Sequence, residues 1–150
     1  MRVICAIGVR GGADLVNSVV ETLAPPVDLV ILHVIDTGPR RGLESLMREP
    51  RRPGRSLAMD EAEASASQAA VDESLQAARA AGLAAQSRVE RGNPEQVIVA
   101  QARQERCDLI VIHASEGAQG RPQIGPASVG HTARFVLDHA PCNVLLLRQR

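Results

Sequence analysis

The sequence predicts an α/β fold: one flavodoxin- or Rossmann-like domain spanning residues 1–150, with a five-stranded parallel sheet and helices on both faces. Five short apolar runs alternate with helix-like segments, an order that needs crossover connections. The runs are mostly continuous in hydrophobicity, as in strands buried on both faces. A chain of 150 residues is the usual size of one domain with a substantial core.

The first part of the chain is predicted to form a strand, a helix and a second strand. Residues 2–7, RVICAI, are a continuous apolar run that predicts a buried strand. Residues 13–24 place apolar side chains at intervals of four, which predicts a helix. Two prolines end that helix before a second buried strand at residues 28–35.

The middle of the chain is predicted to form a loop, a long helix and a weaker strand. Residues 37–56 contain three Pro, three Gly and six Arg, a composition typical of a loop. Residues 57–81 are rich in alanine and stop at Gly82, which predicts a helix with a glycine after its end. Residues 84–90, AAQSRVE, form the weaker strand.

The last third is predicted to contain two helices and two strands. Asn93 is the expected N-cap of a helix with Pro94 at its first position, where a missing N–H costs little. Residues 107–113 form a fourth strand, residues 129–140 a fourth helix and residues 142–148 a fifth strand. In such a sheet, ligands bind beyond the carboxyl ends of the strands, where the strand order reverses.

Composition restricts the function classes. The chain has 17 basic residues, all Arg, against 17 acidic ones, and one Phe as its single aromatic residue, so we expect no nucleic-acid partner. No apolar run approaches the ~18 residues of a membrane span, and the run at the start is too short for a signal peptide. Cys5, Cys107 and Cys142 lie in apolar runs, which suits buried thiols in a reducing compartment, most simply the cytoplasm.

Three segments of the chain together resemble the universal stress protein family. They are LVILHVID at 29–36, GNPEQVIVAQARQERCDLIVI at 92–112 and VGHTARFVLDHAPCNVLLLR at 129–148, and the likeness extends over almost the whole chain. The resemblance implies a flavodoxin-like fold of five parallel strands and a homodimer. The family divides into members that bind ATP and members that do not, and the resemblance implies that this chain belongs to one of these two groups.

The phosphate motif of the ATP-binding members, G-x2-G-x9-G-[ST], is matched in part. Gly117, Gly120 and Gly130 satisfy the three glycine positions. His131 stands where the resemblance implies a hydroxyl, and Thr132 follows one place late. Glycines let backbone N–H groups approach an anion, and a helix start adds further donors, so these five residues are the candidate phosphate site.

Two further departures from the family pattern concern the base and the loop. Gly8 stands where the resemblance implies an Asp that holds the base, whereas Val34 retains a contact made through the backbone. Alignment from the fourth strand instead places His113 and Glu116 on the first two glycine positions. Glu116 then repels an anion unless Arg121 or a divalent metal compensates.

Other candidate sites are weaker. The four histidines lack metal-ligand spacing and no Cys pair supports zinc, so no metal is expected. We expect structural roles for His33 and His139, whereas His113 and His131 border the crevice. Cys142 is expected to be a packed thiol with no catalytic duty.

Three functional hypotheses remain at this point. The first is a dimeric cytoplasmic stress-response protein, paired through its last strand, with a modified and weak site for ATP or phosphate. The second is an interaction module without nucleotide, whose arginine-rich loop, Arg40 to Arg55, docks an acidic protein. The third is an ATP-using hydrolase or transferase, since RGGADL at 10–15 faintly resembles a phosphate loop of the related PP-loop ATPases. That segment lacks both serines, so a turn with Asp14 near a helix start is favoured, and no catalytic residue is assigned.

Overall fold

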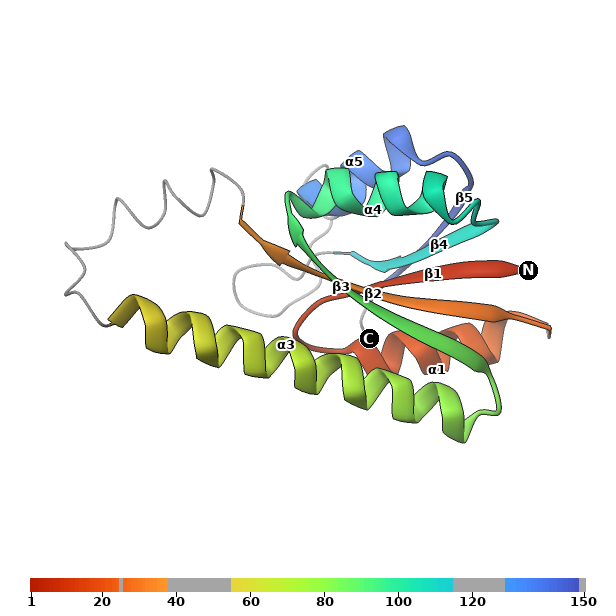
Figure 1. The fold of residues 1–150 in the computed structure, drawn as a ribbon. Helices are drawn as coiled ribbons and strands as arrows, with labels where there is room; N and C mark the ends of the chain where they lie inside the picture. The colour runs from red at the N-terminus through yellow and green to blue at the C-terminus, as the bar shows by residue number, and fades with distance from the viewer. Residues whose placement is uncertain (25, 38–54, 115–128, 149–150) are drawn as a thin grey trace.

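The computed structural model describes residues 1–24, 26–37, 55–114 and 129–148. Within these residues a parallel sheet of five strands has the order β3-β2-β1-β4-β5 (Figure 1). The strands are β1 (Arg2–Ile7), β2 (Asp28–Asp36), β3 (Ala84–Gly92), β4 (Leu109–His113) and β5 (Asn143–Leu147). The helices are α1 (Gly12–Thr22), α3 (Arg55–Ala80), α4 (Pro94–Gln104) and α5 (His131–His139). The predicted fold class and element order are therefore confirmed.

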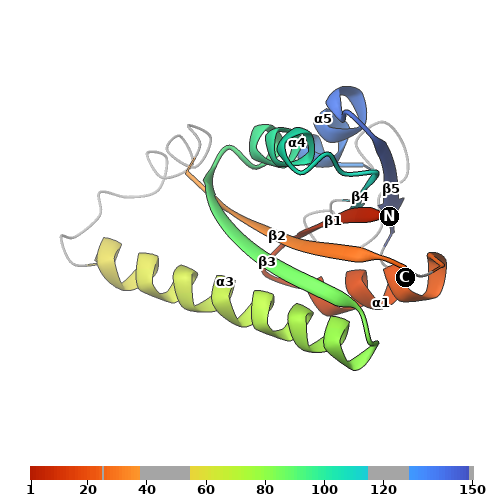
Figure 2. The same ribbon diagram turned by 45° about the vertical axis from the view of Figure 1, so that its right-hand side comes forward.

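Helices cover both faces of the sheet, α1 and α3 on one and α4 and α5 on the other (Figure 2). Side chains of β1 alternate between the two layers. Val3, Cys5 and Ile7 pack with α1 and α3, whereas Ile4 and Ala6 pack with α4 and α5. Because both faces of the strand are covered, its sequence from Val3 to Ile7 is apolar, as predicted.

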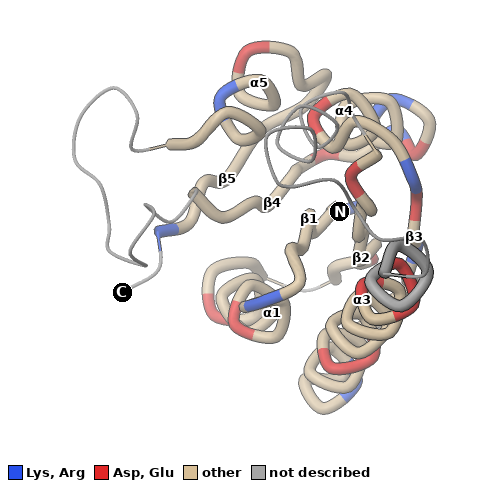
Figure 3. The backbone as a smooth tube through the Cα atoms, turned by 90° about the vertical axis from the view of Figure 1, so that its left-hand side faces the viewer, with Lys and Arg blue, Asp and Glu red and all other residues tan. Residues whose placement is uncertain are grey.

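The two outer strands are less buried than the central ones. Every residue of β3 is exposed or half-buried, which explains its weak apolar pattern in the sequence. In β5 the four residues Val144 to Leu147 are all half-buried. Helix α3 runs beyond the sheet at its amino end (Figure 1), and acidic residues recur along it (Figure 3). None of the helices in the described ranges has the length and hydropathy that a membrane span requires.

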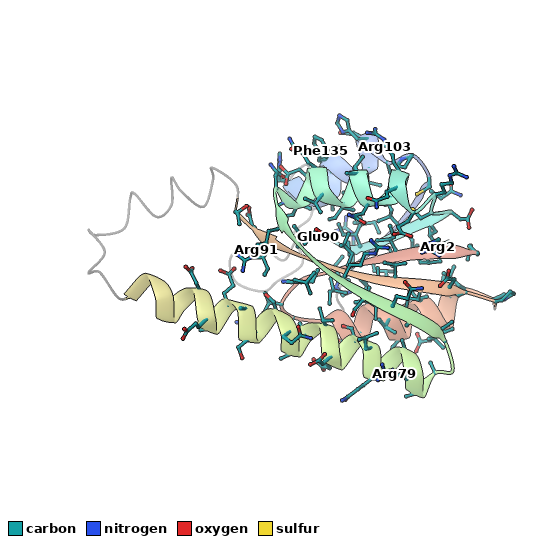
Figure 4. All side chains as sticks on the ribbon, in the orientation of Figure 1. Arg2, Arg79, Glu90, Arg91, Arg103 and Phe135 are labelled. Carbon is teal, nitrogen blue, oxygen red and sulfur yellow. The ribbon has the colours of Figure 1, made fainter. Side chains whose placement is uncertain are left out.

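An arginine network ties the amino ends of the strands together. Arg2, labelled in Figure 4 on β1, donates from Nη1 to Asp28 of β2 at 2.6 Å. Its other terminal nitrogen pairs with Glu105, just after α4, and Glu105 also pairs with Arg88 of β3. Asp108 accepts the Arg2 backbone N–H at 2.7 Å. Ion pairs thus join the starts of β1 and β2 and the end of α4 with the middle of β3.

The close approach of α1 to α3 depends on Gly12. A Cβ atom there would overlap the hydroxyl of Ser74, which is fully buried and donates to the Ala70 carbonyl at 2.7 Å. It would also come within 3.3 Å of Ile7. Glycine at this position therefore serves helix packing.

We expect Gly12→Ala to destabilise the protein by roughly 1–3 kcal/mol through overpacking. Urea unfolding followed by circular dichroism measures this change. Adding Ser74→Ala removes the overlapping hydroxyl and should restore most of the loss. A Gly12→Ala variant as stable as wild type would contradict the packing argument.

Candidate functional site

The candidate site is the edge of the sheet where the strands end. Strand β1 lies between β2 and β4, and the chain leaves β1 through α1 on one face but leaves β4 toward α5 on the other. The strand order therefore reverses between β1 and β4, the position at which open α/β sheets bind ligands. Figure 3 looks onto this edge.

Gly8 and Val34 lie at this edge on neighbouring strands. Gly8 follows the last residue of β1 and is exposed. Among the described residues, a Cβ atom built on Gly8 would meet no atom outside its chain neighbours closer than 3.8 Å, so these residues leave room for a side chain. Val34, two residues before the end of β2, is half-buried and packs on the layer formed by α4 and α5.

Helix α5 begins at the same edge, and its start depends on Gly130. This residue is the N-cap and has φ 80° and ψ 163°, a conformation that is essentially restricted to glycine. Its carbonyl accepts the first helical bond, from the Arg134 N–H at 3.0 Å. Gly130 has no side chain with which to cap the helix, so the first turn presents backbone N–H donors and the positive end of the helix dipole.

A histidine–carboxylate pair lies between the starts of α4 and α5. His131, the first residue of α5, has its Nε2 3.0 Å from Oε1 of Glu95, in the first turn of α4. Because a carboxylate accepts, Nε2 carries the proton in this bond. The Glu95 side chain is about one-tenth exposed and that of His131 about half exposed. Thr132, next in the helix, is half-buried.

The environment keeps Glu95 ionised. Burial by itself raises the pKa of Glu95, but the carboxylate accepts bonds from its own backbone N–H, from His131 and from Asn93, and the net pKa lies below its usual value. Asn93 is the N-cap of α4 with Pro94 after it, as predicted, although its side chain does not cap the helix. The site therefore contains a fixed negative charge beside the start of α5.

Sequence reasoning placed His131 at this crevice but missed Glu95. The two residues are 36 positions apart, and each opens a helix on the same face of the sheet. A signal was present, because helices that follow parallel strands begin at the carboxyl edge, where an acidic first turn is common. The predicted Gly117 and Gly120 lie outside the described residues, as do Glu116, Arg121 and residues 40–54 of the arginine-rich segment.

The remaining histidines fall as the sequence analysis expected. His33 is buried, and its Nδ1 donates to the Ile7 carbonyl at 3.1 Å while Nε2 accepts from the Ser67 hydroxyl at 3.0 Å. The carbonyl can only accept, which assigns the proton to Nδ1. His33 thereby joins the end of β1 to α3. His139 forms a hydrogen bond from its Nδ1 to the Phe135 carbonyl at 2.9 Å, and its ring stacks on the phenyl ring of Phe135. His113 is the last residue of β4 and lies at the candidate site.

The segment RGGADL, residues 10–15, contains the end of the turn before α1 and the first turn of that helix. Gly11 is its N-cap with φ 71°, and Asp14 lies exposed in the first turn of the helix, as expected for a carboxylate near a helix start. Within the described residues, no group of three or more His, Cys, Asp and Glu side chains could hold a metal ion.

The fold is doubly wound and flavodoxin-like, because helices cover both faces of the parallel sheet and the strand order reverses between β1 and β4. Proteins of this class bind ligands at the carboxyl edge of the sheet, beside the reversal. A sequence model described as the universal stress protein family matches residues 1–148. The chain belongs to that family. The comparison with curated proteins found no match.

Solved structures of the same family share the fold. The universal stress protein UspA from Lactobacillus plantarum is 23% identical with a TM-score of 0.65, over 99% of this chain and 97% of its own. A family member from Arabidopsis thaliana, solved with AMP bound, is 15% identical with a TM-score of 0.68, over 100% of this chain and 92% of its own. A universal stress protein in complex with cAMP is 16% identical with a TM-score of 0.67, over 100% of this chain and 98% of its own.

The lowered pKa of Glu95 predicts acid sensitivity. A carboxyl group whose pKa is lower in the folded state stabilises the fold above its ordinary pKa of 4.5, and this stabilisation disappears as the pH falls through the folded value. We expect the free energy of unfolding of wild type to fall more steeply than that of Glu95→Gln as the pH decreases below about 5. Urea titrations at several pH values test this, and parallel curves for the two proteins would contradict it.

Proposed function

We propose that this chain is a stress-response protein of the cytoplasm that binds a nucleotide or phosphate weakly at the carboxyl edge of its sheet. The observation that carries the proposal is the start of α5 beside the reversal of strand order, within a family whose solved members include complexes with AMP and with cAMP. Those ligands make a nucleotide such as ATP the candidate ligand here. No turnover is proposed.

In this proposal the start of α5 holds the phosphate. Gly130, His131 and Thr132 contribute backbone N–H groups at the positive end of the helix dipole. Gly117 and Gly120 belong to the proposed site through the spacing of the motif. The base lies toward Gly8 and Val34, where Val34 can offer backbone groups and Gly8 no side chain.

Two features weaken the proposed binding. Gly8 offers no carboxylate to select adenine, so the site discriminates little between ATP and GTP. The ionised Glu95 lies beside the start of α5 and repels a phosphate. Glu95 also holds the side chain of His131, the residue that stands where the motif has Ser or Thr. The same carboxylate favours the second candidate function, an interaction module that binds no nucleotide.

The nucleotide proposal predicts that wild type binds ATP with micromolar or weaker affinity and binds GTP about equally. A variant that combines Gly8→Asp, His131→Ser and Glu95→Gln should bind ATP at least about tenfold more tightly and prefer it over GTP, since each tenfold step corresponds to ~1.4 kcal/mol. Glu95→Gln is included because His131→Ser alone leaves a buried carboxylate without its partner. Isothermal titration calorimetry measures both affinities.

A control for the charge removed by Glu95→Gln is Asp138→Asn, which also removes one negative charge but at an exposed position near the other end of α5. It should leave ATP affinity unchanged. Tight and ATP-selective binding by wild type would contradict the account of Gly8. If the triple variant also binds no nucleotide while circular dichroism shows it folded, the interaction module replaces the nucleotide proposal.

We further propose that the chain forms a homodimer by antiparallel pairing of β5 strands across a two-fold axis. Strand β5 pairs with β4 on one side and is the outermost strand of the described sheet. Its four residues Val144 to Leu147 are only partly buried, and an open apolar edge invites association. The Leu147 carbonyl accepts from Ala114, so the backbone groups of Leu147 and Leu145 face β4 and those of Leu146 face outward.

Proline at position 146 tests the dimer selectively. Leu146→Pro removes an outward N–H donor and should convert the dimer to a monomer with the fold intact, whereas Leu145→Pro should disrupt the β4–β5 ladder and destabilise the monomer. Native mass spectrometry at tens of micromolar protein reports oligomer size and any co-purified nucleotide together. A wild-type monomer under these conditions would overturn the dimer proposal.

A further inference from the structure

Two cysteines meet at the amino edge of the sheet, opposite the candidate nucleotide site. Cys107 lies two residues before β4 and Cys142 directly before β5, the strand beside it. Their Sγ atoms are 3.1 Å apart, although 35 positions separate the residues in the chain. Both are free thiols. A disulfide bond is ~2.05 Å long, so the two sulfur atoms need to approach each other by only about 1 Å to reach bonding distance.

The two thiols differ in exposure, which suits a reaction in two steps, first at Cys142 and then at Cys107. Cys107 is buried, at 7% exposure, whereas Cys142 is half-buried beside the exposed Pro141 and can meet a small molecule from solvent. Burial, with a further contribution from the Cys142 thiol, raises the pKa of Cys107 to about 12. Cys107 therefore stays protonated and can donate its S–H to the Cys142 sulfur.

From this geometry we infer that Cys107 and Cys142 form a reversible dithiol–disulfide site that a small hydroperoxide oxidises. The Cys142 thiol releases its proton, and the thiolate attacks the outer oxygen of the peroxide. The O–O bond breaks, and the leaving alkoxide, or hydroxide in the case of hydrogen peroxide, takes up that proton, which gives a sulfenic acid at Cys142 and an alcohol or water. The Cys107 sulfur then attacks the Cys142 sulfur, the S–S bond forms, the S–O bond breaks and hydroxide leaves with the Cys107 proton as water. Two thiols lose two electrons, which the hydroperoxide gains.

The third cysteine is an internal reference. Cys5 lies in the central strand β1, has no exposed surface, and burial raises its pKa to about 12. No oxidant reaches it from solvent while the protein is folded. The inferred site therefore uses two of the three thiols and leaves Cys5 reduced.

The test oxidises the folded full-length protein with hydrogen peroxide and counts thiols after denaturation. The free thiols should fall from three to one per chain, and peptide mapping without reductant should recover a Cys107–Cys142 link within one chain. The cross-link closes a loop of 35 residues, so the oxidised protein should unfold at a higher temperature and return to its original value with dithiothreitol.

Matched variants separate this reaction from general thiol oxidation. Cys5→Ala keeps the pair and should still lose two thiols, whereas Cys142→Ser and Cys107→Ser should form no intramolecular link and show no peroxide-dependent rise in unfolding temperature. Circular dichroism confirms that each variant is folded. Three free thiols after oxidation of wild type, links between different chains, or a thermal shift that persists in Cys142→Ser would each overturn the inference.

Discussion

Burial of β1 on both faces is the constraint on which the rest of the structure depends. Val3, Ile4 and Cys5 have no exposed surface, so helices must pack above and below them. Parallel strands cannot be joined by tight turns, and the connections must cross the faces as helices. The carboxyl ends of β1, β2 and β4 therefore meet at one edge, where His33 holds the end of β1 against α3.

At this carboxyl edge the start of α5 presents backbone N–H donors, and a carboxylate lies beside it. Gly130 sets the start of α5 in a conformation that other residues rarely adopt. The next residue, His131, is hydrogen-bonded to the carboxylate of Glu95 in α4. The N–H donors and the helix dipole around Glu95 offset the cost of burying its charge. Attraction from the helix start and repulsion from Glu95 thus act on the same small region.

The amino edge of the sheet carries different chemistry. Arg2 and its acidic partners join β1, β2 and the end of α4 there, and the pair of Cys107 and Cys142 lies beside the same edge at the starts of β4 and β5. The sheet separates the two edges by the length of its strands. The peroxide-sensitive chemistry inferred at the thiols is consequently remote from the residues proposed to bind phosphate, and the two can be tested independently.

The sequence by itself determined the order and type of the described strands and helices, because apolar runs, N-cap residues and breaking prolines are local signals. Position after a strand also indicated Gly8, Gly130 and His131 as residues of the carboxyl edge. The partners of His131 and Cys142 lie 36 and 35 positions away in the chain. Only the tertiary structure decided those pairs, because helix packing and strand order select which distant side chains meet, and no local periodicity encodes that choice.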